Sequence, residues 1–283
     1  MTTGAIIFAH NNSSIDYIKF AVFAATRVNE YLDIPVSLIT DNRDWLLKNY
    51  PNHTFDQVIE LPFIKDPQQQ KRFHDGSLAH KQLEWKNVTR TQIYNLTPYD
   101  RTLVIDSDYI INSSVLKPAL ENDYEFQIYR NSFDLALDRD PDTFTRINAY
   151  SIPFYWATVF IFSKSTVMQA FFDLVEYIKN NWIYFKTLYS LDSTMYRNDF
   201  AFSIAIHIMN NKTSGEFAIE LPGNMIYATD RDILVAAQND KMKFLVEKKD
   251  HLGEYTLVKT SGLDVHVMNK FSLARHIDGV KFD

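Results

Sequence analysis

The 283-residue chain lacks several features that many protein functions require. It has no cysteine, which excludes disulfides, a thiol nucleophile and a thiolate zinc site, and which fits a reducing compartment. No apolar run is long enough to span a membrane, and no basic signal-peptide segment precedes the first predicted strand. Because the formal net charge is −6, a broad nucleic-acid-binding surface is disfavoured. With 46% hydrophobic and 23% charged residues, we expect a soluble cytoplasmic protein.

Glycine is scarce as well, with seven in the whole chain, and it is missing where a phosphate-binding loop would need it. Residues 4–9 have the apolar character of a buried strand, and residues 15–32 carry apolar side chains at helical spacing. A second strand is predicted at residues 35–40, so the chain opens as a right-handed α/β unit. The loop after the first strand, residues 10–14, contains no glycine. A Rossmann dinucleotide site and a Walker phosphate loop are therefore both disfavoured.

The most informative stretch is a short apolar strand that ends in two carboxylates. Residues 102–105 are β-branched or apolar, as in a strand buried on both faces of a parallel sheet, and Asp106, Ser107 and Asp108 follow directly. Since alternate residues of a strand share a face, Asp106 and Asp108 are expected to project together from its carboxyl end, where open α/β sheets bind ligands. Two ionised acids this close need a cation between them, and Mg²⁺ or Mn²⁺ suits carboxylate and phosphate oxygens.

The same stretch also has a simpler interpretation, in which Asp106 turns a loop and Asp108 is solvated. Two acids separated by one residue recur within residues 138–140 and 230–232. The pattern therefore does not identify a metal site without support from elsewhere in the chain.

Basic residues are predicted to lie just before this strand, and a histidine lies near the end of the chain. Residues 84–96 are predicted to form a helix on which Lys86 and Arg90 share a face, either beside a phosphate or in solvent. In the strand-like residues 263–267, alternation places His266 on the face opposite the apolar side chains. A lone histidine on a strand is usually not a ligand, so this position alone does not indicate a metal.

A second polar stripe is predicted on a helix at residues 198–209. Asp199, Ser203 and His207 are spaced by four residues and therefore share one face of this helix. The alternative is that Asp199 caps the helix and His207 lies at the surface.

The remaining segments complete the expected α/β pattern. A strand is predicted at residues 158–163 and a long amphipathic helix at residues 165–185. We expect residues 65–78 to form a polar loop over a ligand and residues 112–151 to be irregular. From residue 215 onward, short strand-like runs alternate with polar turns. No repeat or clear linker divides the chain.

Taken together, these residues resemble the metal-dependent GT-A glycosyltransferases, and most closely the glycogenin and galactosyltransferase-like group, glycosyltransferase family 8. Residues 86–108 are similar to that family's basic helix, Leu-Pro turn and strand ending in an Asp-X-Asp motif. Residues 157–164 are similar to its acceptor-side strand, although they lack its Asn-Ala-Gly sequence. Residues 198–202 are similar to the helix that opens with Asp-Gln in the family, and residues 265–267 to its C-terminal histidine strand.

The resemblance implies a role for each candidate residue. Asp106, Asp108 and His266 would ligate Mn²⁺ or Mg²⁺, which holds the diphosphate of a nucleotide sugar. The implied donor contacts are Asn11 and Tyr17 at the base, Arg90 near the diphosphate or ribose, Ser107 within the acidic motif, and Lys270 at the phosphate. Asp199, together with Asn198, falls where the family places a polar residue beneath the donor sugar, and the family retains the anomeric configuration. Here His266 is followed by Val-Met-Asn-Lys270-Phe, not by the family's glycine and Lys-Pro-Trp.

We therefore predict one GT-A-type α/β domain over residues 1–283, with a mixed, mostly parallel sheet flanked by helices. Its nucleotide-binding half covers roughly residues 1–112 and its acceptor-side half roughly residues 113–283. The predicted activity is metal-dependent transfer of a sugar from a nucleotide donor, a uridine diphosphate sugar, to a glycan, lipid-linked sugar, protein or modified nucleobase. The alternatives are a nucleotidyltransferase, which normally has a glycine-rich signature near its first strand, and a catalytically silent sugar-binding or scaffold protein on the same fold.

Overall fold

The computed structural model describes residues 1–62, 70–86, 89–136, 144–192 and 195–277, and its centre is a seven-stranded sheet. The strand order is β11-β8-β10-β6-β1-β2-β3. The bounds in that order are Ile219–Glu220, Phe126–Tyr129, Trp156–Ser163, Arg101–Asp106, Thr3–Phe8, Val36–Thr40 and Gln57–Glu60. Neighbouring strands are parallel except at β10, which runs antiparallel to both β6 and β8. The prediction of a mixed, mostly parallel sheet is confirmed.

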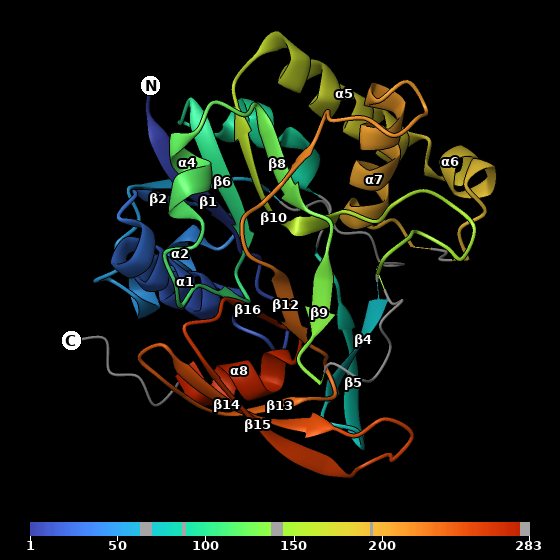
Figure 1. Cartoon of the computed structure of the whole chain (residues 1–283). Coiled ribbons are helices and arrows are strands. Elements are labelled where there is room, and N and C mark those ends of the chain that lie inside the picture. Colours follow the sequence, from blue (N-terminus) through green and yellow to red (C-terminus); the bar gives the residue numbers. More distant parts are fainter. Residues whose placement is uncertain (63–69, 87–88, 137–143, 193–194, 278–283) are drawn as a thin grey trace.

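Helices flank this sheet (Figure 1). They are α1 (Tyr17–Leu32), α2 (Arg43–Asn49), α3 (Ile93–Leu96), α4 (Lys117–Glu121), α5 (Thr166–Asn180), α6 (Trp182–Leu188), α7 (Asn198–Met209) and α8 (Lys270–Ile277). The apolar stripe of α1 packs against β1 and β2, whereas α5 and α7 pack on one another and α7 contacts β10. Together with the sheet, these helices enclose the larger hydrophobic core. Within the described part of the chain, each helix is too short or too polar to cross a lipid bilayer.

Smaller sheets lie in the lower half of Figure 1. One has the order β7-β16-β12-β9, another is the antiparallel meander β13-β14-β15, and β4 and β5 form a hairpin. Their bounds are Tyr109–Ile110 (β7), Val265–Val267 (β16), Met225–Ala228 (β12), Ser132–Asp134 (β9), Ile233–Gln238 (β13), Lys241–Glu247 (β14), Tyr255–Ser261 (β15), Gln70–Asp75 (β4) and Ala79–Glu84 (β5). A second hydrophobic cluster includes Phe244 of β14 and Leu273 of α8. Because β16 pairs with β7, the C-terminal part of the chain returns to the carboxyl end of β6.

Two predictions for the segment before β6 are wrong. Of the polar loop predicted at residues 65–78, residues 70–75 form β4, which pairs with β5 in a hairpin, and residues 63–69 lie outside the described residues. β5 extends to Glu84, so the predicted helix at 84–96 is reduced to a 3₁₀ turn at Thr89–Gln92 followed by α3. Lys86 and Arg90 therefore do not share a helix face.

Two further corrections concern the middle of the chain. The stretch predicted to be irregular, residues 112–151, contains α4, β8 and β9, while residues 137–143 lie outside the described residues. The single helix predicted at residues 165–185 is divided into α5 and α6. The backbone of Asn181 leaves the helical region between them, with φ −114° and ψ 33°. Asparagine commonly ends helices because its side chain competes for backbone hydrogen bonds.

Candidate active site

A cavity of about 720 Å³ opens at the carboxyl ends of β1 and β6. Phe8 from β1 and Asp106 from β6 contribute to its lining. The antiparallel strand β10 contributes Trp156, the tail of the chain contributes His266, and the β4–β5 hairpin contributes Phe73. The cavity is therefore enclosed by elements from both ends and the middle of the chain, at the edge of the sheet where α/β folds bind ligands.

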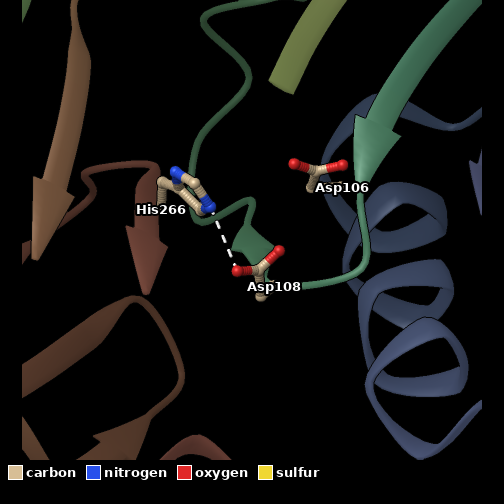
Figure 2. A group of neighbouring side chains, drawn as sticks. All are labelled: Asp106, Asp108 and His266. Carbon is tan, nitrogen blue, oxygen red and sulfur yellow. Dashed lines mark hydrogen bonds and ion pairs between the residues drawn. The ribbon is translucent and has the colours of Figure 1, made fainter. Parts of the chain in front are cut away.

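Three metal-ligating side chains meet in this cavity. Asp106 ends β6, Asp108 follows immediately before β7, and His266 lies on β16 directly opposite Tyr109 of β7. One ligand atom from each of Asp106, Asp108 and His266 lies within 4.8 Å of the others. Figure 2 shows the imidazole of His266 directed at the Asp108 carboxylate, with Nε2 3.0 Å from Oδ2. The strand pairing thus brings the C-terminal imidazole to the acidic motif.

Two cationic side chains already pair with these acids. The guanidinium of Arg90 forms an ion pair with Asp106, and the ammonium of Lys270 forms one with Asp108. Burial raises the pKa of the Asp108 carboxyl, but Lys270 and His266 outweigh burial and hold that pKa well below its ordinary value. Burial lowers the pKa of Arg90 to about 10, while Asp199 and Asp108 oppose the shift, so Arg90 stays charged at neutral pH.

The acidic pair and the imidazole fit a divalent cation such as Mg²⁺ or Mn²⁺. Two carboxylates and one imidazole form a donor set that these cations accept. Each acid uses one oxygen for its ion pair, Oδ1 of Asp106 and Oδ2 of Asp108, so the second oxygen of each carboxylate is left for a cation. Asp108 and His266 are both buried, which limits competition from water.

The backbone of Ala157 connects this acidic group to Asp199. Its carbonyl accepts a hydrogen bond from Arg90, the residue paired with Asp106. Its N–H donates to Oδ1 of Asp199 at 3.0 Å, and Arg197 donates to Oδ2 of the same carboxylate at 2.9 Å. Asp199 therefore uses its side chain to bind β10 and a neighbouring cation, and it lines the cavity at the first turn of α7.

The other residues of the predicted polar stripe on α7 have different surroundings. Ser203 is buried; its hydroxyl donates to the Asp199 carbonyl and accepts a hydrogen bond from the N–H of Tyr155. His207 lies in the last turn of α7 and is not among the cavity-lining residues. Only the start of the stripe faces the cavity.

Most of the remaining predicted site residues line the same cavity. These are Tyr17, Ser107, Asn198 and Lys270. Burial raises the pKa of the Tyr17 phenol above its ordinary value and the charge of Asp108 adds to this, so Tyr17 is neutral. Asn11 is not among the lining residues: its side-chain oxygen accepts a hydrogen bond from the N–H of Ile18 at 3.0 Å and so supports the first turn of α1.

Several cavity residues were not predicted from the sequence. They are Lys71, Trp85, Trp156, Arg197 and Tyr227, among others. Arg197 directly precedes Asn198, and Trp156 at the start of β10 directly precedes the predicted segment 157–164. Their position next to predicted residues was the one feature of the sequence that could have identified them. Lys71 belongs to a strand that was expected to be a loop, and no local pattern marked it.

The other two acid-X-acid patterns differ from the one at residues 106–108. Residues 138–140 lie outside the described residues. Asp232 is buried and accepts hydrogen bonds from the N–H groups of Thr229 and Glu247, which makes it a turn-stabilising residue. Asp230 lines the cavity, but it is not part of the metal-ligating group found among the described residues.

Comparison with known proteins gives only distant similarities. No protein-family model and no curated protein sequence matches the chain. The chain is similar to the crystal structure of the glycosyltransferase GlyE in Streptococcus pneumoniae TIGR4, at 12% identity and a TM-score of 0.42, over 78% of this chain and 45% of that one. It is also similar to the galactosyltransferase LgtC in complex with donor and acceptor sugar analogues, at 15% identity and a TM-score of 0.41, over 80% and 74%. The chain spans less than half the length of GlyE. Similarities this distant do not assign the chain to a family.

Proposed function

We propose that the protein is a metal-dependent glycosyltransferase, which moves a sugar from a nucleotide donor, a uridine diphosphate sugar, to an acceptor with retention of configuration. The observation that carries this proposal is the meeting of Asp106, Asp108 and His266 in one cavity at the carboxyl ends of β1 and β6. Two acids and an imidazole beside buried cations suit a divalent ion and a diphosphate. The absence of glycine from residues 10–14 makes a nucleotidyltransferase the weaker alternative.

The charge balance of the cavity supports metal-dependent binding of a diphosphate. Among the described residues, the cationic lining residues are Lys71, Lys86, Arg90, Arg197, Arg231 and Lys270. The carboxylate lining residues are Asp106, Asp108, Asp134, Asp199, Asp230 and Glu247. Because these six cations and six carboxylates cancel, a diphosphate finds no net positive charge until a divalent cation adds two. We therefore expect nucleotide diphosphate and metal to bind together.

The residues around the acids have separate roles in this proposal. When bound to Asp106, Asp108 and His266, Mn²⁺ or Mg²⁺ would act as a Lewis acid that stabilises negative charge developing on the diphosphate. Lys270 adds a fixed positive charge beside Asp108. In the transfer, the bond between the anomeric carbon and the diphosphate oxygen would break, the acceptor oxygen would form the new bond to that carbon, and the hydroxyl proton would pass to the departing diphosphate oxygen. Asp199 would stabilise the positive charge that develops at the anomeric carbon.

A thermal-shift measurement with uridine diphosphate, with and without Mn²⁺, tests the proposal. A ligand at one hundred times its dissociation constant stabilises the folded state by about 2.7 kcal/mol, which for a chain of this length raises the unfolding midpoint by about 5 °C. We expect uridine diphosphate to add this shift to that of Mn²⁺ alone, and to give no shift when Mn²⁺ is absent. We expect Asp108→Asn to abolish the added shift.

The matched control is Asp134→Asn, which removes a charge from the same cavity but leaves the acidic pair and His266 intact. Its amide oxygen can still accept the hydrogen bond that Asp134 accepts from the N–H of Ala136. We expect the control to keep the metal-dependent shift. An equal shift without Mn²⁺, or in Asp108→Asn, would contradict the proposal. A catalytically silent binding protein would show the shift but no hydrolysis of a uridine diphosphate sugar.

A further inference from the structure

Lys71 differs from the other cations of the cavity in its partners. Five of the six cationic lining residues form an ion pair with a carboxylate; the pairs are Lys86–Asp41, Arg90–Asp106, Arg197–Asp199, Arg231–Glu247 and Lys270–Asp108. Lys71 has no carboxylate partner at ion-pair distance among the described residues. Its ammonium group is therefore available to a ligand.

Aromatic rings hold Lys71 on the cavity face of the β4–β5 hairpin. The hairpin register pairs Lys71 with Leu83 and Phe73 with Lys81, so these four side chains share one face. Phe73 and Leu83 are buried, which fixes that face toward the protein. The Nζ atom of Lys71 lies 5.7 Å from the ring centroids of both Phe73 and Trp85. Two cation–π contacts restrain the ammonium group without neutralising its charge.

The electrostatic surroundings of Lys71 are those of an anion site. Burial of the group within the cavity walls, followed by repulsion from Lys270 and Arg197, lowers the pKa of Lys71 to about 8. Attraction to Asp230 and Asp108 opposes the shift but is smaller. Although the cavity walls surround it, the Lys71 side chain is exposed to solvent at the cavity surface. A ligand in the cavity can therefore reach its charge. An anion bound between Lys71 and Arg197 would relieve the repulsion between these two cations.

We propose that Lys71, with Arg197, binds an anionic group, a phosphate or carboxylate, carried by the acceptor. This inference rests on the proposed transferase function and adds the class of acceptor to it. Arg90, with 6% of its side chain exposed, and Lys270, with 13%, lie deep beside the acidic pair, where the donor diphosphate is expected. Arg197, with 35% exposed, and Lys71 lie on the open side, where an acceptor enters. The acceptor is therefore expected to carry a phosphate or a carboxylate group.

Glucose 6-phosphate is a suitable probe, and glucose is its neutral counterpart. Binding of both to the full chain is measured by calorimetry, with saturating uridine diphosphate and Mn²⁺ present and also without them. We expect glucose 6-phosphate to bind at least about tenfold more tightly than glucose. This is the affinity difference that corresponds to one hydrogen bond with a charged group. Lys71→Met should remove this preference, while Lys71→Arg should keep it and uridine diphosphate binding should change little in either variant.

Lys81→Met is the matched control, because Lys81 lies on the same face of the same hairpin. Its Nζ lies 5.7 Å from the ring centroid of Phe271, and it does not line the cavity. The control should bind both probes as the unmodified protein does. The proposal is overturned if the unmodified protein does not prefer glucose 6-phosphate to glucose, or if Lys71→Met and Lys81→Met behave alike. It is also overturned if Lys71→Met weakens uridine diphosphate as much as glucose 6-phosphate, because Lys71 would then serve the donor.

The two proposals can fail separately. If uridine diphosphate does not bind in the presence of Mn²⁺, the proposed function fails. The titrations without nucleotide then still decide whether Lys71 provides an anion site.

Discussion

The carboxylate of Asp199 is held in place by hydrogen bonds to both of its oxygens. One carboxylate oxygen accepts from the backbone of Ala157 and the other from Arg197. The carbonyl of the same Ala157 accepts from Arg90, which pairs with Asp106. A single backbone unit of β10 therefore fixes the distance between the acidic motif and Asp199. Such fixed charges stabilise a developing charge without reorganising during the reaction.

Replacing Asp199 by asparagine tests this role. The amide oxygen can still accept from the N–H of Ala157, so we expect the fold and nucleotide binding to be retained. Loss of the negative charge should lower the rate of donor-sugar hydrolysis or transfer about 100-fold or more. Turnover and binding of uridine diphosphate with Mn²⁺ are measured on the same preparations.

Ser203→Ala is the control for Asp199→Asn, because Ser203 lies one turn later on α7 and its hydroxyl hydrogen-bonds to two backbone groups. We expect it to lower the free energy of unfolding by about 1–3 kcal/mol, since the N–H of Tyr155 loses its acceptor, without changing turnover. Equal turnover in Asp199→Asn and the unmodified protein would exclude Asp199 from the reaction.

The β4–β5 hairpin is an element whose position depends on the C-terminal part of the chain. Arg275 of α8 donates two hydrogen bonds to Asp75 at the end of β4, at 2.8 and 2.7 Å. At the turn, the N–H of Ser77 donates to the hydroxyl of Tyr255 on β15. These contacts place Lys71 and Phe73 over the cavity. The hairpin therefore belongs structurally to the C-terminal sheets, although it is formed from the first third of the chain.

The Asp75–Arg275 pair gives a prediction for stability and its pH dependence. Hydrogen bonds from Arg275 hold the pKa of Asp75 below its ordinary value, against the opposing effect of burial. A lowered carboxyl pKa stabilises the fold above the ordinary value of about 3.9, and this stabilisation is lost as the pH falls through the lower folded value. We expect Asp75→Asn to cost about 0.5–1 kcal/mol at pH 7, because the pair is partly exposed, and to cost progressively less as the pH falls below about 4.

Urea unfolding of Asp75→Asn at several pH values measures this difference. Glu254→Gln is the matched control, since Glu254 pairs with Lys248 at 3.2 Å but both side chains are largely exposed and belong to one local turn. Its effect should stay within about 0.5 kcal/mol at all pH values. A cost for Asp75→Asn that does not change with pH would show that the ion pair is not its source.

Elements were predictable from the sequence where local pattern and burial agree. The run that became β6 is buried along its length, and α7 has the predicted bounds of residues 198–209. β4 and β5 were missed because their outward faces are polar and their pairing depends on contacts with α8 and β15. β8 was missed because it has four residues and its partners, β10 and β11, come later in the chain.

The residues of the candidate site were predictable from the sequence only where they belong to one local pattern. Asp106 and Asp108 could be identified as candidate ligands because they end one apolar strand. His266 was linked to them only by resemblance to a family. No spacing in the sequence could show that β16 pairs with β7. Lys71 could not be identified as a site residue from the sequence, because a lysine in a polar strand has the same local pattern as a solvated surface lysine.

At the scale of the whole molecule, the candidate metal site joins two parts of the chain. Asp108 and His266 are 158 residues apart, and the segments that carry them meet through the β7–β16 pairing. The N–H of Val267 also donates to the carbonyl of Asp108 at 2.9 Å. A cation that binds both segments stabilises only conformations in which they are together. Metal binding should therefore be visible in the stability of the whole fold.

Mn²⁺ alone is expected to raise the unfolding midpoint, and chelation is expected to reverse the rise. At one hundred times its dissociation constant the ion stabilises the fold by about 2.7 kcal/mol. His266→Ala should lose at least half of this effect, because one of three protein ligands is removed. Hydrogen exchange should show added protection in β7 and β16 together, since the two strands exchange backbone hydrogen bonds. The control is His207→Ala, which changes a histidine outside the cavity. If Mn²⁺ protects β7 but not β16, the ion binds the acids without the imidazole, and the C-terminal part of the chain has no role in holding it.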